Sequence, residues 1–384
     1  MLGFITLFIY RKYEFKSPFV MPIAIMLLSY LISHIFSVNF ENSTKEIIRF
    51  ISYIMIFSMV GLSNRSQKDT LIKIMVFSAS IVSIYAIYQY FWGYDILLNG
   101  LNSTQNFLVS NSSYAKDILI GKRAISTFPS PNILGGYLIM MFFLALYLSK
   151  RYKIALIAVI LISFALLLTK SMGAWLSLIV ALIIYVVVGY KTLRFEKRIA
   201  IISSIFIVLA LIFILLSRGE RLINLENPQN SITQRIAYWK TAINIIKYHP
   251  IFGVGPGNFQ EVFLKYKIGS DTDTRYAHNL FLQIWVELGI LGLIGLIYLL
   301  SMIVKNLRTK LQNNLILFVS IVFMMHNIID ITYFIPQVSF FWWVILGILL
   351  RVTTESLNRS LPYDGPSSEQ KLQTSSGAGP PTRI

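Results

Sequence analysis

An arginine and a histidine stand directly before a long apolar segment in RYAHNLFLQIWVELGILGLIG, residues 275–295. Histidine titrates near neutral pH and often serves as a general base. Arginine binds phosphate oxygens through paired N–H groups, and the N-terminus of a helix attracts anions. Arg275, His278 and a helix start meet where a polar segment ends. The stretch is therefore typical of a place where a phosphate is held beside a base.

His326 and Asp330 stand four residues apart near the end of a later apolar segment. If one helix runs through both, they share a face. Polar groups inside a membrane span usually face the bundle interior and mark function, but a buried structural pair explains this spacing nearly as well. Both interpretations stay open.

No metal site and no cofactor is expected. The chain has no cysteine, which excludes thiolate ligands and a thiol nucleophile. Asp271-Thr-Asp273 has the spacing of a metal-binding aspartate pair, but it lies in a polar loop just before Arg275. Arginines can supply the positive charge that such a metal would otherwise provide.

The composition indicates a membrane protein. Of 384 residues, 55% are hydrophobic and only 13% are charged, whereas a soluble domain carries about 25% charged residues. Apolar runs long enough to cross a bilayer recur along the chain. The sequence therefore predicts an all-α, polytopic transmembrane helical bundle of about 11–12 spans, with a large extracytoplasmic loop containing amphipathic helices. Besides a short apolar segment at 2–10, the predicted spans are 18–38, 47–63, 70–92, 131–149, 153–169, 173–190, 199–216, 278–304, 314–330 and 337–351.

The charge pattern gives a topology. The net charge of +17 would suggest nucleic acid in a soluble protein, but sixteen of the thirty-four basic residues fall in five short loops. Such loops lie in the cytoplasm, so no nucleic-acid partner is expected. The two long loops, 93–130 and 217–277, then lie outside the cytoplasmic membrane. The predicted parts are N-terminal spans over 1–216, a large extracytoplasmic loop over 217–277, C-terminal spans over 278–351 and a disordered cytoplasmic tail over 352–384.

Within the large loop, 231–248 has a helical pattern. Its apolar stripe predicts an amphipathic helix at the membrane surface, with Ser231 as N-cap. The stripe consists of Ile232, Ile236, Trp239, Ile243 and Ile246. The segment GVGPGNF at 253–259 follows, and its glycines predict a tight turn whose backbone approaches a ligand or a helix.

Three blocks resemble the O-antigen ligase and polymerase superfamily of bacterial membrane glycosyltransferases. They are GKRAISTFPSPNILGGYL at 121–138, the pattern R-x3-W-x8-HPIFGVGPGNF from Arg235, and R-x2-HN-x-FLQ-x3-ELGILGL from Arg275. Their order and spacing agree with that superfamily over about 120–350. One departure is TKSMG at 169–173, where Met172 stands in place of a common arginine and Lys170 is the nearest cation.

The resemblance implies transfer of a glycan from undecaprenyl pyrophosphate to a sugar hydroxyl on the outer face of the bacterial cytoplasmic membrane. His278 would be the base. Arg275, Arg235, Arg123 and Lys170 would bind the pyrophosphate, with His326, Asp330 and Asn279 in support. The implied partners are the lipid-linked donor, a lipid- or glycan-linked acceptor and membrane lipids. Because Arg275 and the helix N-terminus both disfavour the imidazolium, the pKa of His278 is expected to fall.

Two alternatives remain. A polymerase would extend lipid-linked chains by the same chemistry, and the sequence does not separate it from a ligase. A transporter of lipid-linked glycans would show internal repeats and spans broken by Gly or Pro in matching halves, and no such symmetry is seen. The placement of the polar residues in one exterior loop favours the enzyme.

Overall fold

The computed structural model describes residues 18–96, 121–192, 230–269, 274–309 and 314–350, with the single positions 212 and 216. Within these ranges every regular element is a helix and no strand occurs, which confirms the predicted all-α class. The predicted segments 2–10 and 352–384, nearly all of the predicted span 199–216, and Asp271-Thr-Asp273 lie outside the described residues.

Three helical stretches in the described ranges are long and apolar enough to cross a membrane, namely Arg65–Ile96, Pro131–Ser149 and Leu280–Lys305. Five shorter apolar helices occur where further spans were predicted. The chain is thus a helical membrane protein. Its total number of spans stays a prediction, because two predicted segments fall outside the described ranges.

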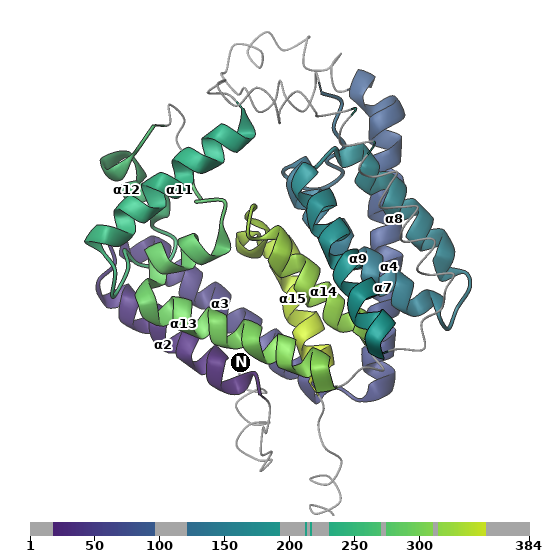
Figure 1. The fold of residues 1–384 in the computed structure, drawn as a ribbon, viewed down its shortest axis with the longest axis horizontal. Coiled ribbons are helices and arrows are strands. Elements are labelled where there is room, and N and C mark those ends of the chain that lie inside the picture. The colour runs from purple at the N-terminus through teal and green to yellow at the C-terminus, as the bar shows by residue number, and fades with distance from the viewer. Residues whose placement is uncertain are drawn as a thin grey trace, which may run out of the picture. The chain divides into compact units, whose positions relative to one another are not determined.

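The helices form two groups that α14 and α15 connect (Figure 1). In the first group, α13 packs on α2, and α2 packs on α3. In the second, α4 and α7 pack on α8, and α7 packs on α9. Helix α14 lies against α7 while α15 lies against α3. The bounds are α2 Val20–Ile35, α3 Phe40–Leu62, α4 Arg65–Tyr88, α7 Pro131–Ser149, α8 Ala155–Thr169, α9 Met172–Thr192, α13 Leu280–Thr309, α14 Asn314–His326 and α15 Pro336–Leu349.

Several predicted helix ends are wrong; α4 begins at Arg65 instead of 70 and α13 runs to Thr309 instead of 304. Asparagine side chains explain two further errors. Helix α3 begins at Phe40 instead of 47, because the Asn39 side chain accepts hydrogen bonds from the backbone N–H groups of Glu41 and Asn42. Helix α14 ends at His326 instead of 330. There Asn327 bonds through its amide nitrogen to the carbonyl of Phe323 and through its amide oxygen to the N–H of Tyr333. Both groups of the amide thus stop the helix. A 3₁₀ turn, η3 (Thr332–Phe334), follows.

Two helices fill the described part of the large loop. Helix α11 (Ser231–Tyr248) has the predicted bounds, but its cap is Asn230 and not Ser231, since the Asn230 side chain accepts the N–H of Ile232. With the short α12 (Phe259–Tyr266) it encloses a small core that also includes Ala277 and Val286. From the predicted apolar stripe, Ile236 and Ile243 are exposed, which agrees with a face toward lipid.

A break in α13 receives the glycine-rich loop. Gly289 has φ 68° and ψ −167°, a conformation that only glycine adopts readily. The break leaves helix carbonyls without their usual partners, and the loop supplies new ones. The N–H of Val254 donates to Val286 at 2.9 Å, and that of Gly255 donates to Glu287 at 3.1 Å. The predicted turn thus brings its backbone against a helix.

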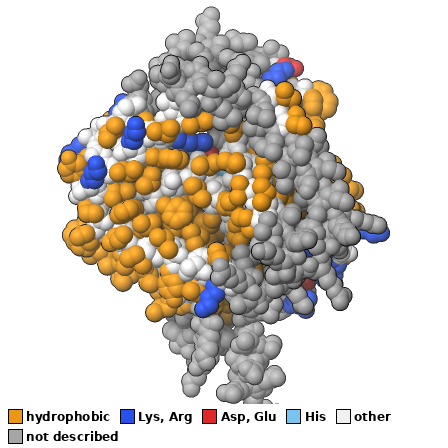
Figure 2. Space-filling view, in the orientation of Figure 1, with side chains coloured by type: hydrophobic (Ala, Val, Ile, Leu, Met, Phe, Trp, Pro, Cys, Tyr) orange, Lys and Arg blue, Asp and Glu red, His pale blue; other side chains and the backbone are white. Residues whose placement is uncertain are grey.

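Apolar side chains cover the outer faces of α2 and α13. Figure 2 shows a broad hydrophobic band, with Lys and Arg near its margins. On α13 the exposed residues Ile290, Ile294, Ile297 and Val304 recur at helical spacing. Such a stripe is typical of a helix that faces lipid, because a soluble protein rarely exposes so continuous an apolar surface.

Candidate active site

His278 is held in a strained backbone conformation at the start of α13. Its φ is 53°, in the left-handed region that residues other than glycine rarely adopt. Two consecutive residues of α11 fix it there. The Tyr238 ring stacks on the imidazole at a centroid distance of 5.8 Å, and the Trp239 indole N–H donates to the carbonyl of His278 at 3.4 Å. Strain of this kind persists where the surroundings determine it, and it concentrates at functional sites.

The next residue, Asn279, caps α13. Its side-chain oxygen accepts the N–H of Leu282 at 3.0 Å, and the side chain of Gln283 accepts the N–H of Ala277 at 2.6 Å. These two bonds enclose His278 between fixed neighbours. Asn279 therefore has a structural role, because its side chain sets where α13 begins.

Arg235 of α11 forms an ion pair with Asp330, in the turn after α14. Nη2 of Arg235 lies 3.1 Å from Oδ2 of Asp330, and the two side chains are 18% and 2% exposed. A guanidinium has five N–H donors, and this contact uses one of them. The pair joins the large loop to the C-terminal helices and leaves donors for an anion.

The charges of this pair act on His278. Burial lowers the pKa of His278 to about 4, Asp330 opposes the shift and Arg235 adds to it. The direction is the predicted one, but the predicted cause is wrong, because Arg235 and not Arg275 is the cation that contributes. Nδ1 of His278 is buried without a hydrogen-bond partner in the described part of the chain. A neutral imidazole with a vacant ring nitrogen is able to accept a proton.

His326 also lies near Asp330. The two interact electrostatically although α14 ends at His326, so the expectation that both share a helix face is wrong while their proximity holds. The buried His326 ring packs against Gly136 of α7, where an added Cβ would lie 2.7 Å from its Cδ2. It also lies beside Gly173 of α9. Glycines at these two positions make room for the ring.

Arg123 and Lys170 lie together in a different place. Arg123 is buried and donates to the carbonyl of Thr169 at 3.0 Å and to the side chain of Asn132 at 2.9 Å. Nζ of Lys170 donates to the carbonyl of Gly121 at 2.8 Å. These bonds tie the first sequence block to the end of α8. Asn132 and Gly136 are one turn apart on α7, so this region adjoins His326.

Arg275 is exposed, and no ion pair or hydrogen bond joins it to Arg235 or Asp330 among the described residues. Its guanidinium lies 5.5 Å from the centre of the Tyr276 ring and interacts electrostatically with Glu46 of α3. The structure therefore brings His278, Arg235, Asp330 and His326 into one cluster and places Arg275 at its edge.

Sequence reasoning missed Tyr238 and Arg49, and it gave Trp239 a place in the apolar stripe and the second block but not beside His278. Tyr238 and Trp239 follow Arg235 by three and four positions, a spacing that puts all of them on one side of a helix and could have revealed both. Arg49, which pairs with Glu46 next to Arg275, stands in an apolar stretch of α3 far from any of the three blocks. No sequence signal connects it to them.

Comparison with known proteins gives a family match over part of the chain. A model of the O-antigen ligase domain matches residues 156–297, which include α11 and His278. The chain is 23% identical to the ComP-specific O-oligosaccharyltransferase of Acinetobacter baylyi over 398 aligned positions, covering 94% of this chain and 67% of that protein. It is 28% identical to an uncharacterized protein of Haemophilus influenzae over 220 positions, half of this chain and 53% of that one.

Proposed function

We propose that this chain transfers a glycan from undecaprenyl pyrophosphate to an acceptor hydroxyl. The O-antigen ligase model matches residues 156–297, and the O-oligosaccharyltransferase relative aligns with 94% of the chain. The domain match and the relative support a lipid-linked glycan transferase in the membrane. We further propose that the reaction takes place on the outer face of the cytoplasmic membrane. Both the resemblance to the superfamily and the charges of the predicted loops favour that side.

One observation carries the proposal. A partly buried imidazole, whose Nδ1 has no hydrogen-bond partner among the described residues, lies beside an arginine whose ion pair with Asp330 uses one of its five N–H donors. In the transfer, the acceptor oxygen bonds to the anomeric carbon and its proton passes to Nδ1 of His278. The bond between that carbon and the phosphate oxygen breaks, and undecaprenyl pyrophosphate departs with the electron pair. Arg235 and Arg275 stabilise the charge that develops on it.

Charge also explains how so weak a base works. In the protein without ligand the pKa of His278 is about 4. A bound pyrophosphate brings negative charge next to the ring, which favours the imidazolium and raises that pKa toward the working pH. Asp330 supports the imidazolium as it forms. Binding of the donor thus activates the base.

Arg123 and Lys170 are assigned a positioning role. Their contacts with backbone oxygens and an amide hold the 121–130 segment against α8, which favours structure over phosphate binding. With arginines at the leaving group, we propose that no metal is needed, so turnover should persist in excess EDTA.

Two candidate functions differ in the acceptor that receives the glycan. The superfamily favours a sugar hydroxyl, either on a terminal acceptor for a ligase or on a growing chain for a polymerase. The name of the Acinetobacter relative, a ComP-specific O-oligosaccharyltransferase, favours a hydroxyl on a protein as the second candidate. Chemistry at the donor is the same in both.

Purified protein in detergent should be given the lipid-linked donor and each acceptor in turn, and the products separated on a gel. One added glycan per acceptor supports a ligase, a ladder supports a polymerase, and a shifted protein band supports the second candidate. Donor binding without turnover with any acceptor would contradict the enzyme and favour a carrier.

A further inference from the structure

Glu287 is a buried carboxylate inside α13 that the proposed transfer does not use. It is 5% exposed, and none of the ion pairs among the described residues includes it. An acidic side chain inside a membrane helix is costly unless polar groups bond to it, and such a residue usually marks function. The groups that bond to Glu287 therefore indicate what it does.

The glycine-rich loop bonds to Glu287 through backbone N–H groups. The N–H of Phe259 donates to Oε1 of Glu287 at 3.4 Å, and the N–H of Gly257 donates to the same carboxylate. The main-chain carbonyl of Glu287 accepts the N–H of Gly255 and the hydroxyl of Ser33. The loop thus docks on both the main chain and the side chain of one residue.

Gln283, one turn earlier on α13, extends these bonds toward the base. Its Nε2 donates to Oε1 of Glu287 at 2.6 Å, and its Oε1 accepts the N–H of Ala277 at 2.6 Å. Gln283 is 1% exposed and Ala277 is fully buried, so water has little access to either bond. One partner accepts and the other donates, which fixes the orientation of the amide. A continuous path of hydrogen bonds thus runs from the loop to the residue before His278.

This path ends where the backbone is strained. His278 has a φ of 53°, and its carbonyl accepts the indole N–H of Trp239. The bond between Ala277 and Gln283 holds the backbone on the N-terminal side of His278, while the bond from Trp239 holds it on the C-terminal side. Without one of these bonds the backbone is free to relax to an ordinary φ, which would move the imidazole relative to its charged neighbours.

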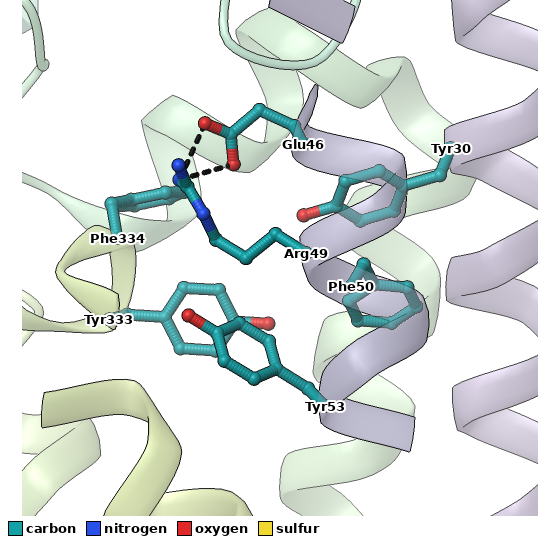
Figure 3. Close-up of a pocket in the computed structure, with 7 residues that line it drawn as sticks. All are labelled: Tyr30, Glu46, Arg49, Phe50, Tyr53, Tyr333 and Phe334. Atoms are coloured by element: carbon teal, nitrogen blue, oxygen red, sulfur yellow. Dashed lines mark hydrogen bonds and ion pairs between the residues drawn. The ribbon is translucent and has the colours of Figure 1, made fainter. Parts of the chain in front are cut away.

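The glycine-rich loop has a firm support on its other side. An added Cβ at Gly257 would lie 2.8 Å from Cγ of Glu46 on α3, so the loop and this side chain are in close contact. Two bonds from Nη1 of Arg49, of 2.6 and 2.7 Å, hold the Glu46 carboxylate (Figure 3). The amide of Asn258 donates to the hydroxyl of Ser43 at 3.1 Å and joins the loop to α3 a second time. The loop is therefore fixed between α3 and α13.

We propose that Gln283, held by Glu287 and the glycine-rich loop, is a positioning residue that keeps His278 oriented for catalysis. The loop then contributes to the reaction without touching the substrate, because its docking on α13 is passed to the base through two side chains. The catalytic purpose of this arrangement rests on the proposed function, whereas the path of hydrogen bonds does not.

Transfer kinetics of the purified full-length protein test the proposal. Gln283→Met keeps the length of the side chain but removes both hydrogen bonds, so kcat should fall about 10²-fold, the loss expected for a catalytic group displaced by about 1 Å. The KM and the affinity for the donor should stay at their wild-type values. Asn244→Leu is the structural control, because the Asn244 amide donates to the carbonyl of Tyr266 and does not bond to the path. It should lower the Tm and leave kcat unchanged.

An exchange of the two side chains provides the conservative rescue. Gln283→Glu alone places two carboxylates against each other and should lower kcat as Gln283→Met does. In the double variant Gln283→Glu/Glu287→Gln, the new carboxylate at position 283 accepts the N–H of Ala277, and the new amide at position 287 donates to that carboxylate. The kcat should then recover to within about fivefold of the wild-type value, the equivalent of one weakened hydrogen bond.

A second background shows whether Gln283 acts through His278. In His278→Ala, Gln283→Met should cause no further loss of kcat, because the group that Gln283 positions is already absent. If Gln283→Met does not fold, Gln283→Glu takes its place in both backgrounds. An equal loss in both backgrounds would overturn the proposal, since Gln283 would then have a general structural role. A wild-type kcat in Gln283→Met would overturn it too, as would a double variant no faster than Gln283→Glu alone.

NMR of protein labelled at histidine gives a readout without transfer. The chain has four histidines, so His278→Ala identifies the signal of His278. Gln283→Met should shift that signal and leave the signal of His249 unchanged, since His249 bonds to the Tyr266 hydroxyl outside the path. If the signal shifts but the wild type transfers no glycan, the proposed function fails and the positioning stands. If the wild type transfers glycan and the signal does not move, the positioning alone fails.

Discussion

Nη2 of Arg235 lies 3.1 Å from Oδ2 of Asp330, a residue 95 positions further along the chain. This ion pair brings the large loop and the end of α14 together at His278. Both residues are far from His278 in the sequence, yet the charges of both act on its ring. The pair is thus where two parts of the chain assemble one site.

Breaking the Arg235–Asp330 pair should destabilise the protein. Loss of one partner from a buried pair typically costs about 3–5 kcal/mol, and the 18% exposure of Arg235 suggests the lower end of that range. Arg235→Ala and Asp330→Ala should each lower the Tm in detergent. The double variant should cost clearly less than the sum, because the partners are coupled. Additive losses would mean that the pair contributes no mutual stabilisation.

Arg235 should not be replaceable by lysine in donor binding. Lysine carries the charge but lacks the planar fork that binds two phosphate oxygens while also contacting Asp330. Arg235→Lys should weaken the affinity for undecaprenyl pyrophosphate about tenfold or more, measured by isothermal titration in detergent micelles. Arg218→Lys makes the same exchange elsewhere in the predicted loop and should bind the donor normally. Full affinity in Arg235→Lys would move the pyrophosphate elsewhere.

The value of kcat/KM should begin to fall only at an unusually low pH. The pKa of His278 in the free protein is about 4, so its ring remains neutral down to that pH. Since kcat/KM reports groups of the free enzyme, its value should stay level from pH 7 to pH 5 and fall as pH approaches 4. Because Arg235 lowers this pKa, Arg235→Gln should shift the limb upward. A wild-type limb near the ordinary histidine pKa of about 6.5 would contradict the geometry.

The break in α13 should tolerate only glycine. An added Cβ at Gly289 would lie 1.9 Å from the carbonyl oxygen of Ile251, in addition to the backbone strain. Gly289→Ala should therefore lower the Tm strongly, by the equivalent of more than about 3 kcal/mol. Gly269→Ala is the matched control, since Gly269 also has positive φ but open space around it, and it should cost about 1 kcal/mol. Equal losses of stability in the two variants would mean that the contact between the glycine-rich loop and Gly289 does not stabilise the protein.

Much of the fold could be predicted because apolar runs and helix periodicity are local signals. Helices α7 and α11 have the predicted bounds. Two of the errors in helix ends occur where a side chain overrides the pattern. Asn39 starts α3 early, and Asn327 stops α14 before Asp330. The break at Gly289 has no local signal, since its cause is a loop more than thirty residues earlier in the chain.

The candidate site could be predicted only in part. Types and spacing single out His278 and Arg235, and the structure brings them together. Arg275 also stands close to His278 in sequence, but its guanidinium lies toward Glu46. Which way a side chain points depends on tertiary packing. For the same reason the stacking of Tyr238 on His278 could not be predicted.

The central claim is that His278 is the base, and the most direct test compares wild type, His278→Ala and His249→Ala. His249 is a matched control, because it lies after α11 and bonds to the Tyr266 hydroxyl outside the cluster. Rates of glycan transfer and affinity for undecaprenyl pyrophosphate-linked donor should be measured on the same preparations. His278→Ala should lose about 10²–10⁴-fold in rate while binding donor normally, and His249→Ala should retain activity. Transfer by His278→Ala at near the wild-type rate would contradict the account.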